Sequence, residues 1–383
     1  MKEVKIGFCA VALAAASHSV MAAPFAHEAR SLGMGNVGIA TADIATAPFA
    51  NPAMLSFQKV DDDFSLLLTA GAFFSDNDGV IDDIDAFQES ADDFEKLAIA
   101  QGLDGKVIAP ELSGALAVGF TTEKYSMAVS ARMDVVVAGG LSNVSQDIFT
   151  IDDPTYNLLN IVGAQTTEVG FSIARSFELM EKKVSIGLTP KIVNVEAVKY
   201  SESISLPDTG LDNLTDDIQD LGDFTTLDLG MVMAVSDNVR VGVTVKNLMT
   251  EEMSFQTTDA NNVTTTTTLL FDTQLKVGVA YSGDVLTLGA DLDLTENDSI
   301  VSTGTVTGLK RQNLSLGMEF NAFDYAQLRL GMIKNMADGI SSADKEALYT
   351  AGVGLWLGFN LDLAVMSGAG ESLGAVVQTG FKF

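Results

Sequence analysis

The chain has 383 residues, of which 47% are hydrophobic, and its formal net charge at pH 7 is −29. Its mean hydropathy is +0.25, although its pI is near 4.1. Acidity of this degree excludes nucleic acid as a partner, because the phosphate backbone would be repelled. The acid lies mainly in connecting segments, with ten Asp or Glu residues at 76–104 and seven at 201–223.

The first 22 residues have the pattern of a secretory signal peptide. Lys2 and Lys5 precede an apolar run at 6–16, and small residues follow at 20–23. The run is too short to span a membrane as a helix. Cys9 is the only cysteine and lies in this segment. We therefore expect a mature chain without disulfides, Cys-ligated metal or thiol chemistry.

The next segment, 23–58, is rich in small residues and has no apolar periodicity long enough for a helix or strand. It contains Asn51-Pro52-Ala53 within the run at 47–55. The stretch at 29–55 resembles the N-terminal hatch of FadL-like outer-membrane transport proteins, and 47–55 is most similar to their conjugal-transfer TraF-like branch. The resemblance implies a fourteen-stranded barrel plugged by its own N-terminus, and uptake of hydrophobic compounds.

Two features in the N-terminal part of the mature chain bear on other functions. The run at 33–38 spells the dinucleotide fingerprint G-x-G-x-x-G, but it follows an export signal and does not sit between a strand and a helix. His27 is the only histidine left after cleavage, which argues against a Ser-His hydrolase. We expect no enzyme activity, no cofactor and no bound metal.

Strands with one buried and one wet face are predicted by alternation of apolar and polar side chains. In the stretch at 284–294, leucine and alanine alternate with threonine, glycine and aspartate. Fourteen such stretches occur, at roughly 62–75, 109–121, 124–137, 166–178, 183–200, 223–236, 238–249, 271–282, 284–294, 311–321, 324–334, 347–358, 360–367 and 372–383.

The connections between these stretches are of two kinds. Six are tight and seven are longer, including those at 76–108, 138–165 and 250–270. Outer-membrane barrels have short periplasmic turns and longer outer loops. The sequence therefore predicts an all-β fold, a transmembrane antiparallel barrel of about 14 strands with the N-terminal hatch in its lumen.

Two local patterns interrupt the alternation. Apolar residues recur at helical spacing at 81–97 and at 211–221, which predicts helices whose apolar faces form either a cap or a greasy groove for an amphipathic ligand. In the third stretch, Asp134 is followed by three valines at 135–137. This break predicts a bulge that opens a lateral exit through the wall.

The polar faces of the stretches carry charges that would line the lumen. Such charges either pair across the lumen or bind a ligand, in which case a cation would hold a carboxylate head group. The possible ligand-binding cations are Arg132, Lys191, Arg240, Lys276 and Arg329, and the acids on the same faces include Glu168, Asp228, Asp291, Glu319 and Asp362.

The last stretch ends in an aromatic residue. Val377, Thr379, Phe381 and Phe383 alternate with polar or small residues, and this ending resembles the C-terminal sorting signal of outer-membrane barrels. The resemblance implies that the barrel-assembly machinery recognises Phe383. Together with the leader, it predicts a protein embedded in the lipid of the outer membrane of a Gram-negative bacterium.

The predicted organisation is a signal peptide at 1–22, a hatch at 23–58 and a barrel at 59–383. The predicted function is an outer-membrane channel for small hydrophobic molecules, gated by the hatch. The alternative is a structural or interaction role at the cell surface, connected with conjugal transfer.

Overall fold

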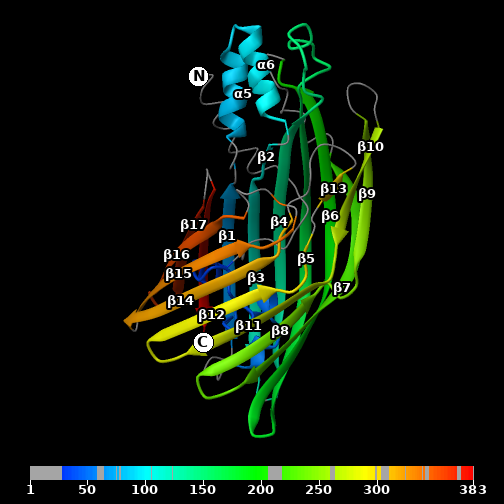
Figure 1. The fold of residues 1–383 in the computed structure, drawn as a ribbon. Coiled ribbons are helices and arrows are strands. Elements are labelled where there is room, and N and C mark those ends of the chain that lie inside the picture. Colours follow the sequence, from blue (N-terminus) through cyan, green and yellow to red (C-terminus); the bar gives the residue numbers. More distant parts are fainter. Residues whose placement is uncertain are drawn as a thin grey trace.

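A computed structural model shows a closed antiparallel barrel with a plug inside it (Figure 1). The predicted signal peptide, His27 and Phe383 lie outside the part of the chain that the structure describes. The described residues are 28–57, 64–74, 76, 79–104, 106–122, 124–205, 218–258, 264–297, 300–302, 310–323, 325–338, 340, 345–368 and 372–382.

The barrel wall confirms the predicted fold class. The main sheet has 15 strands, and one of them, β2 (Val107–Ile108), pairs only with the upper end of β4, which leaves 14 in the wall. The first and last wall strands pair and close the barrel. Each wall strand overlaps one predicted stretch. They are β1 (Phe64–Phe74), β3 (Glu111–Thr121), β4 (Ser126–Ser142), β5 (Leu158–Leu179), β6 (Lys182–Ser203), β7 (Gln219–Ala234), β8 (Val239–Lys246), β11 (Gln274–Ser282), β12 (Leu286–Asp293), β14 (Asn313–Phe323), β15 (Ala326–Asn335), β16 (Ala347–Trp356), β17 (Asn360–Ser367) and β18 (Leu373–Lys382).

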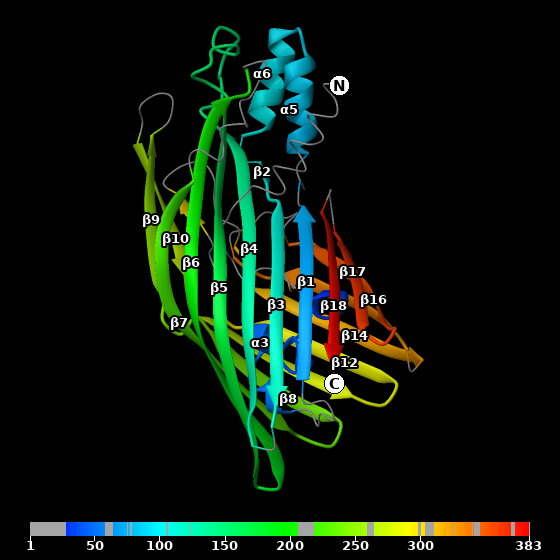
Figure 2. The same cartoon turned by 180° about the vertical axis from the view of Figure 1, so that it is seen from behind.

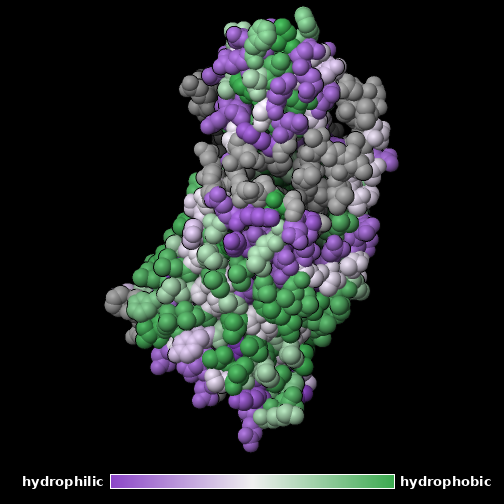
Figure 3. Space-filling model, viewed as in Figure 1, coloured by the Kyte–Doolittle hydropathy of each residue, from purple (hydrophilic) through white to green (hydrophobic). Residues whose placement is uncertain are grey.

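The outward face of the wall is apolar. Leu116, Val129, Ile192, Leu330 and Leu363 are all exposed to the surroundings. Figure 3 shows hydrophobic residues spread over the lower part of the molecule, hydrophilic residues above them and at the lower edge, and both kinds on the outer cap. A surface of this kind is stable in hydrocarbon and not in water. Of the helices in the described residues, none is long and apolar enough to cross a membrane.

The wall is taller on one side, and helices cap it there (Figures 1 and 2). β5 and β6 each have 22 residues, whereas β8, β12 and β17 have eight. α5 (Val80–Glu89) and α6 (Asp93–Gly102) lie at the top, so the helical spacing predicted from 81 onward is confirmed. Their apolar faces belong to one buried cluster with the loops and upper strands, which makes them a cap. The cluster includes Val80, Phe87, Ala100, Leu103, Leu141, Ile151 and Ile204.

The second predicted helix is not seen. Residues 206–217 lie outside the described residues, and Leu221, assigned to that helix, lies in strand β7. The loop expected at 250–270 is also more ordered than predicted. It contains strands β9 (Glu251–Thr258) and β10 (Thr264–Phe271), which form a second sheet with β13 (Ile300–Ser302).

The second sheet covers an apolar patch on the inner face of the tall wall. Phe255, Leu269 and Phe271 belong to one buried cluster with side chains of β4–β7. The rings of Phe224 and Phe271 lie 4.8 Å apart between centroids. The upper end of the lumen therefore has an apolar lining.

The predicted bulge in β4 is wrong. The pairing of β4 with β3 and with β5 keeps one register through residues 133–136, and on the β5 side through 142. Beyond Pro110, β2 continues the same register. Val135, Val136 and Val137 are all buried, so the apolar run reflects a segment covered on both faces, not a kink. No lateral exit exists at this position.

The wall ladder is interrupted instead between β5 and β6. The pairs 171–190 and 172–189 are missing, although the register is the same on both sides of the gap. Pro190 is exposed on the outer face of β6 and has no N–H to donate to a neighbouring strand. The missing N–H group of Pro190 therefore explains the gap in the ladder between β5 and β6.

The hatch fills the lumen. It contains three short helices, α2 (Ala29–Gly33), α3 (Ala47–Ala50) and α4 (Met54–Phe57), where no element was expected. Most of residues 28–57 are buried. Residues 42–57 supply most of an apolar cluster that also contains Ala128, Ala174 and Val232 of the wall. The plug is thus the core of the barrel, which agrees with the predicted fold.

Glycines on the lumen face allow the hatch backbone to touch the wall. A Cβ on Gly317 would lie 2.0 Å from the Met34 carbonyl oxygen, and one on Gly331 would lie 2.0 Å from the Gly35 nitrogen. No real Cβ tolerates such contacts. Similar contacts with the hatch occur along seven consecutive wall strands, and we call these residues the glycine belt: Gly187, Gly230, Gly242, Gly278, Gly289, Gly317 and Gly331.

Candidate functional site

The Asn51-Pro52-Ala53 motif joins the two halves of the hatch to the wall. The Asn51 side-chain amide donates to the Ile39 carbonyl at 2.9 Å and to the carbonyls of Met231 and Val243, each at 3.4 Å. Its oxygen accepts from the Ala53 N–H at 3.1 Å. Asn51 is fully buried. An asparagine suits this position because it offers donor and acceptor in one short side chain.

An ion cluster holds the start of the hatch. Arg30 forms two hydrogen bonds to Glu319, at 2.8 and 2.9 Å. Arg329 contacts the same carboxylate at 2.8 Å and Asp362 at 2.5 Å. Arg329 was predicted as a possible ligand-binding cation. The structure places it in a cluster of two cations and two acids, where it fastens the hatch to β14–β17.

Arg240 also contacts the hatch. Its guanidinium donates to the Ala40 carbonyl and lies 6.0 Å from the centroid of the Phe57 ring. Its predicted ligand role stays a prediction, and it does not line the lumen cavity described below.

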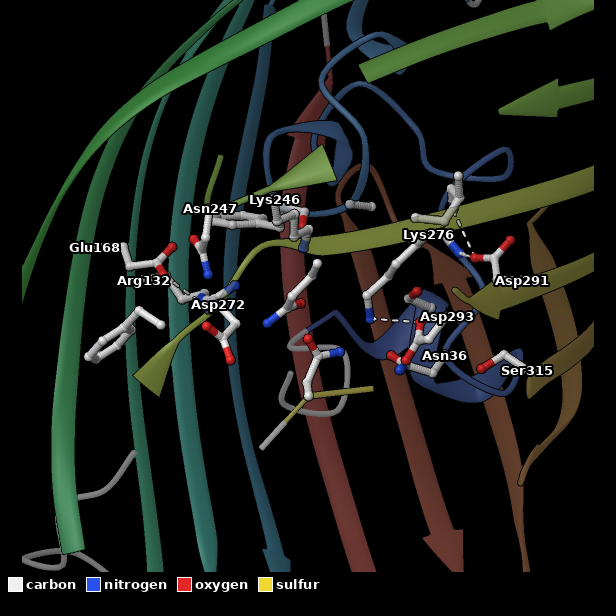
Figure 4. Close-up of a pocket in the computed structure, with 18 of the residues that line it drawn as sticks. Asn36, Arg132, Glu168, Lys246, Asn247, Asp272, Lys276, Asp291, Asp293 and Ser315 are labelled. Atoms are coloured by element: carbon white, nitrogen blue, oxygen red, sulfur yellow. Dashed lines mark hydrogen bonds and ion pairs between the residues drawn. The ribbon is translucent and has the colours of Figure 1, made fainter. Parts of the chain in front are cut away.

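A cavity of about 90 Å³ lies beside the hatch, between the tall wall of β4–β6 and the strands β10–β14 (Figure 4), with room for several water molecules. Three of the five predicted cations, Arg132, Lys191 and Lys276, line it. Their function as ligand-binding groups stays a prediction. Figure 4 shows Arg132, Glu168 and Lys246 on one side and Lys276, Asp291 and Asp293 on the other.

Most of the cavity's cations are paired with acids of the wall. Arg132 lies 2.5 Å from Asp134 and 3.4 Å from Glu168. Lys191 lies 3.2 Å from both Glu168 and Asp228. Lys276 lies 3.0 Å from Asp293. These lumen charges are therefore paired, but within one strand or between neighbouring strands of the wall and not across the lumen as expected.

Sequence reasoning missed Lys246 and Glu28. Lys246 donates to the Phe49 carbonyl of the hatch, and alternation along β8 would have placed it on the same face as Arg240. Glu28 lies at the start of the hatch, where no periodicity signals a position. Apolar side chains line the remaining part of the cavity: Ile39, Phe49, Leu270 and Phe271.

A buried ion pair crosses between two separate parts of the wall near the outer end of the lumen. Arg311, which precedes β14, donates through both terminal nitrogens to Glu111 at the start of β3. Both residues are buried. Five wall strands separate β3 from β14 along one side of the barrel, so the pair ties the outer segment before β14 to the opposite part of the rim.

No group of three or more His, Cys, Asp or Glu side chains is placed to hold a metal ion in the described ranges.

Comparisons with known proteins agree with this architecture. The profile of the family described as "F plasmid transfer operon, TraF, protein" matches residues 48–293. Among solved structures, the chain is similar to the toluene transporter TbuX of Ralstonia pickettii, with 14% sequence identity and a TM-score of 0.55. The alignment covers 92% of this chain and 97% of TbuX. No curated protein matches the chain in sequence.

Two structures of TodX give the same result. The toluene transporter TodX of P. putida is 13% identical with a TM-score of 0.50, over 92% of this chain and 97% of that one. A TodX mutant described as a monoaromatic hydrocarbon channel is 12% identical with a TM-score of 0.56, over 93% and 98%. At these identities the likeness shows the fold alone, which is that of bacterial outer-membrane barrels.

Proposed function

Because the chain belongs to the TraF family and has the FadL-like barrel fold, we propose that it is an outer-membrane channel for small hydrophobic molecules, gated by its hatch. The observation that carries the proposal is a lumen closed by the hatch, with a cavity directly beside it. The apolar cluster of Phe224, Phe255, Leu269 and Phe271 lies at the upper end of this lumen. A hydrophobic molecule entering from the outer end would meet this lining first.

The hatch is the proposed gate because nearly all of its described residues, 28–57, lie inside the lumen. Its contacts with the wall are hydrogen bonds, ion pairs and backbone-to-glycine contacts. Polar contacts such as Gly35 N–H to Thr350 Oγ1, at 2.9 Å, can exchange with water or ligand. A local shift of the hatch would join the cavity to the periplasmic side without opening the wall.

Removal of the hatch tests this proposal. A chain lacking residues 24–50 is expected to form a barrel that conducts ions in a planar bilayer, whereas the intact protein should be nearly silent. Heat-modified mobility on a gel checks that the shortened barrel is closed. Equal conductance of the two proteins at the same salt concentration would refute hatch gating. Native mass spectrometry of the purified protein would show which small molecule it carries.

A role at the cell surface is the second candidate. The family's description refers to plasmid transfer, and the outer cap presents the exposed aromatic side chains Phe94 and Phe149. Deletion of the cap helices, residues 80–102, should lower mating frequency on this reading while leaving ligand carriage unchanged. Unaltered mating with such a variant would exclude it.

A further inference from the structure

Three buried side-chain oxygens that line the cavity have no hydrogen-bond partner in the described part of the chain, and a fourth group, the Glu28 carboxylate, accepts only from its own backbone N–H. Thr166 Oγ1, Asp291 Oδ1 and Asn297 Oδ1 form no hydrogen bond, and these residues are 1%, 6% and 2% exposed. The Glu28 carboxylate, 3% exposed, forms no ion pair or hydrogen bond with another described residue. Buried polar atoms are normally satisfied, so this set of groups favours a polar ligand in the cavity.

The group that fits these atoms is a hydrogen-bond donor. The atoms of Glu28, Asp291 and Asn297 concerned are acceptor oxygens, although the Asn297 amide nitrogen donates elsewhere, to the Thr295 carbonyl, and the hydroxyl of Thr166 can accept as well. The lining contains five acids and four bases, namely Glu28, Glu168, Asp272, Asp291 and Asp293 against Arg132, Lys191, Lys246 and Lys276. Lys246, the one base of this lining without an ion pair among the described residues, donates to the Phe49 carbonyl and attracts the Glu28 carboxylate electrostatically. Among the lining residues that the structure describes, the buried acids without an ion pair, Glu28 and Asp291, outnumber this single base, which favours a positively charged ligand.

The remaining Asp291 oxygen shows how the cavity is coupled to the hatch. Asp291 Oδ2 accepts from the N–H groups of Gly38 and Ile39, at 2.6 and 2.9 Å. Its Oδ1 has no hydrogen-bond partner in the described part of the chain. Glu28 belongs to the hatch and Asp291 to the wall, so a ligand bound between these acceptors would contact both parts.

The outer surface of the protein favours the same kind of ligand. α5 and α6 carry acids in their first turns, Asp82, Asp83, Asp93 and Glu95, and the whole chain has a net charge of −29. A negative potential at the outer end concentrates cations there and raises their rate of arrival. The apolar side chains Ile39, Phe49, Leu270 and Phe271 leave space for a carbon chain beside the polar wall.

We propose that this cavity binds a small amphipathic amine. Its ammonium group would donate to the carboxylates of Glu28 and Asp291 and, through its third N–H, to the side-chain oxygen of Thr166 or Asn297, with its apolar part against Phe49 and Phe271. The proposal deepens the channel function proposed above and rests on it for its physiological meaning. It assigns the substrate class as a protonated amine with a short hydrocarbon body. Purely apolar hydrocarbons would leave the buried acceptors unsatisfied.

Equilibrium binding to the full mature chain in detergent tests the proposal. The probes are n-butylammonium, n-butanol and n-butyrate, which share a carbon chain and differ in the head group. Isothermal titration calorimetry should show binding by the amine and at least tenfold weaker binding by the other two. Glu28→Gln should weaken amine binding about tenfold, equivalent to about 1.4 kcal/mol.

Two further variants separate a binding effect from a folding effect. Thr166→Val keeps the side-chain shape and removes one acceptor, and it should weaken amine binding about threefold. Glu178→Gln, exposed at the far end of β5 and ten residues along that strand from the lining residue Glu168, removes one negative charge away from the cavity and should leave binding unchanged. The proposal is overturned if butanol or butyrate binds as tightly as the amine, if no probe binds, or if Glu28→Gln binds like the unaltered chain.

This result is independent of the gating test. A protein that binds butylammonium but shows no hatch-dependent conductance would retain the site and lose the proposed gate. If conductance depends on the hatch but butanol binds more tightly than butylammonium, the proposed channel function stands and the proposed amine site is refuted.

Discussion

Replacing one glycine of the glycine belt by alanine should loosen the hatch without changing its chemistry. In Gly317→Ala, the new Cβ would lie 2.0 Å from the Met34 carbonyl oxygen, more than 1 Å closer than ordinary contact allows. The obstructing atom is backbone, which cannot move aside by changing rotamer. Overpacking of this kind costs about 1–3 kcal/mol. We expect a lower midpoint of thermal unfolding, by about 2–4 °C per kcal/mol for chains of a few hundred residues.

The matched control is Gly114→Ala, also in the wall. Its nearest non-neighbouring atom would be the Thr69 carbonyl oxygen at 3.8 Å, an ordinary contact. Thermal unfolding followed by circular dichroism in detergent should separate the two variants, and planar bilayers should show leak currents only for Gly317→Ala. If the two variants unfold at the same temperature and both are silent, the close packing of hatch on wall has been misjudged.

Four other changes have defined outcomes. Arg329→Ala should destabilise the barrel by about 3–5 kcal/mol, because Glu319 and Asp362 would lose a buried partner; a change in unfolding midpoint no larger than that of an exposed substitution would contradict this. Asn51→Ala should raise bilayer conductance, since the hatch loses its bonds to Met231 and Val243, and a silent variant would show that other contacts suffice. Pro190→Val should restore a ladder hydrogen bond worth about 0.5–1.5 kcal/mol, seen as a higher temperature for the heat-modified gel shift; no shift would mean that the gap has another cause. Deletion of Phe383 should leave the protein unfolded and degraded in the periplasm, and a normal heat-modifiable barrel after that deletion would refute the predicted sorting signal.

The wall was predictable because alternation is a strong signal when one face meets hydrocarbon. The errors arose where both faces are covered. The valines at 135–137 broke the alternation because the segment is buried throughout, and β9 and β10 were missed because their Thr-rich and acidic composition was assigned to an outer loop. In the hatch, packing against the wall determines three short helices that sequence periodicity cannot indicate.

The candidate site was harder to predict than the fold. Alternation along each strand correctly assigned Arg132, Lys191, Lys276 and Arg329 to the lumen. It could not show that Arg329 and Arg30 of the hatch would share the carboxylate of Glu319. Arg30 and Glu319 are 289 positions apart, and no sequence pattern relates residues at that separation. Glu28 was missed for the same reason, since its surroundings come from strands distant in the sequence.

The enclosed hatch couples closure of the barrel to packing of its core. The Ala29 N–H donates to Gln378 in the last wall strand, and Lys382 contacts Asp43, so the first and last described segments of the chain meet. β1 directly follows the hatch and pairs with β18. The residues that close the seam are therefore also residues that hold the hatch, so the last strand pairs with β1 and contacts the plug through the same segment. Final closure of the barrel and final packing of its core are then a single event.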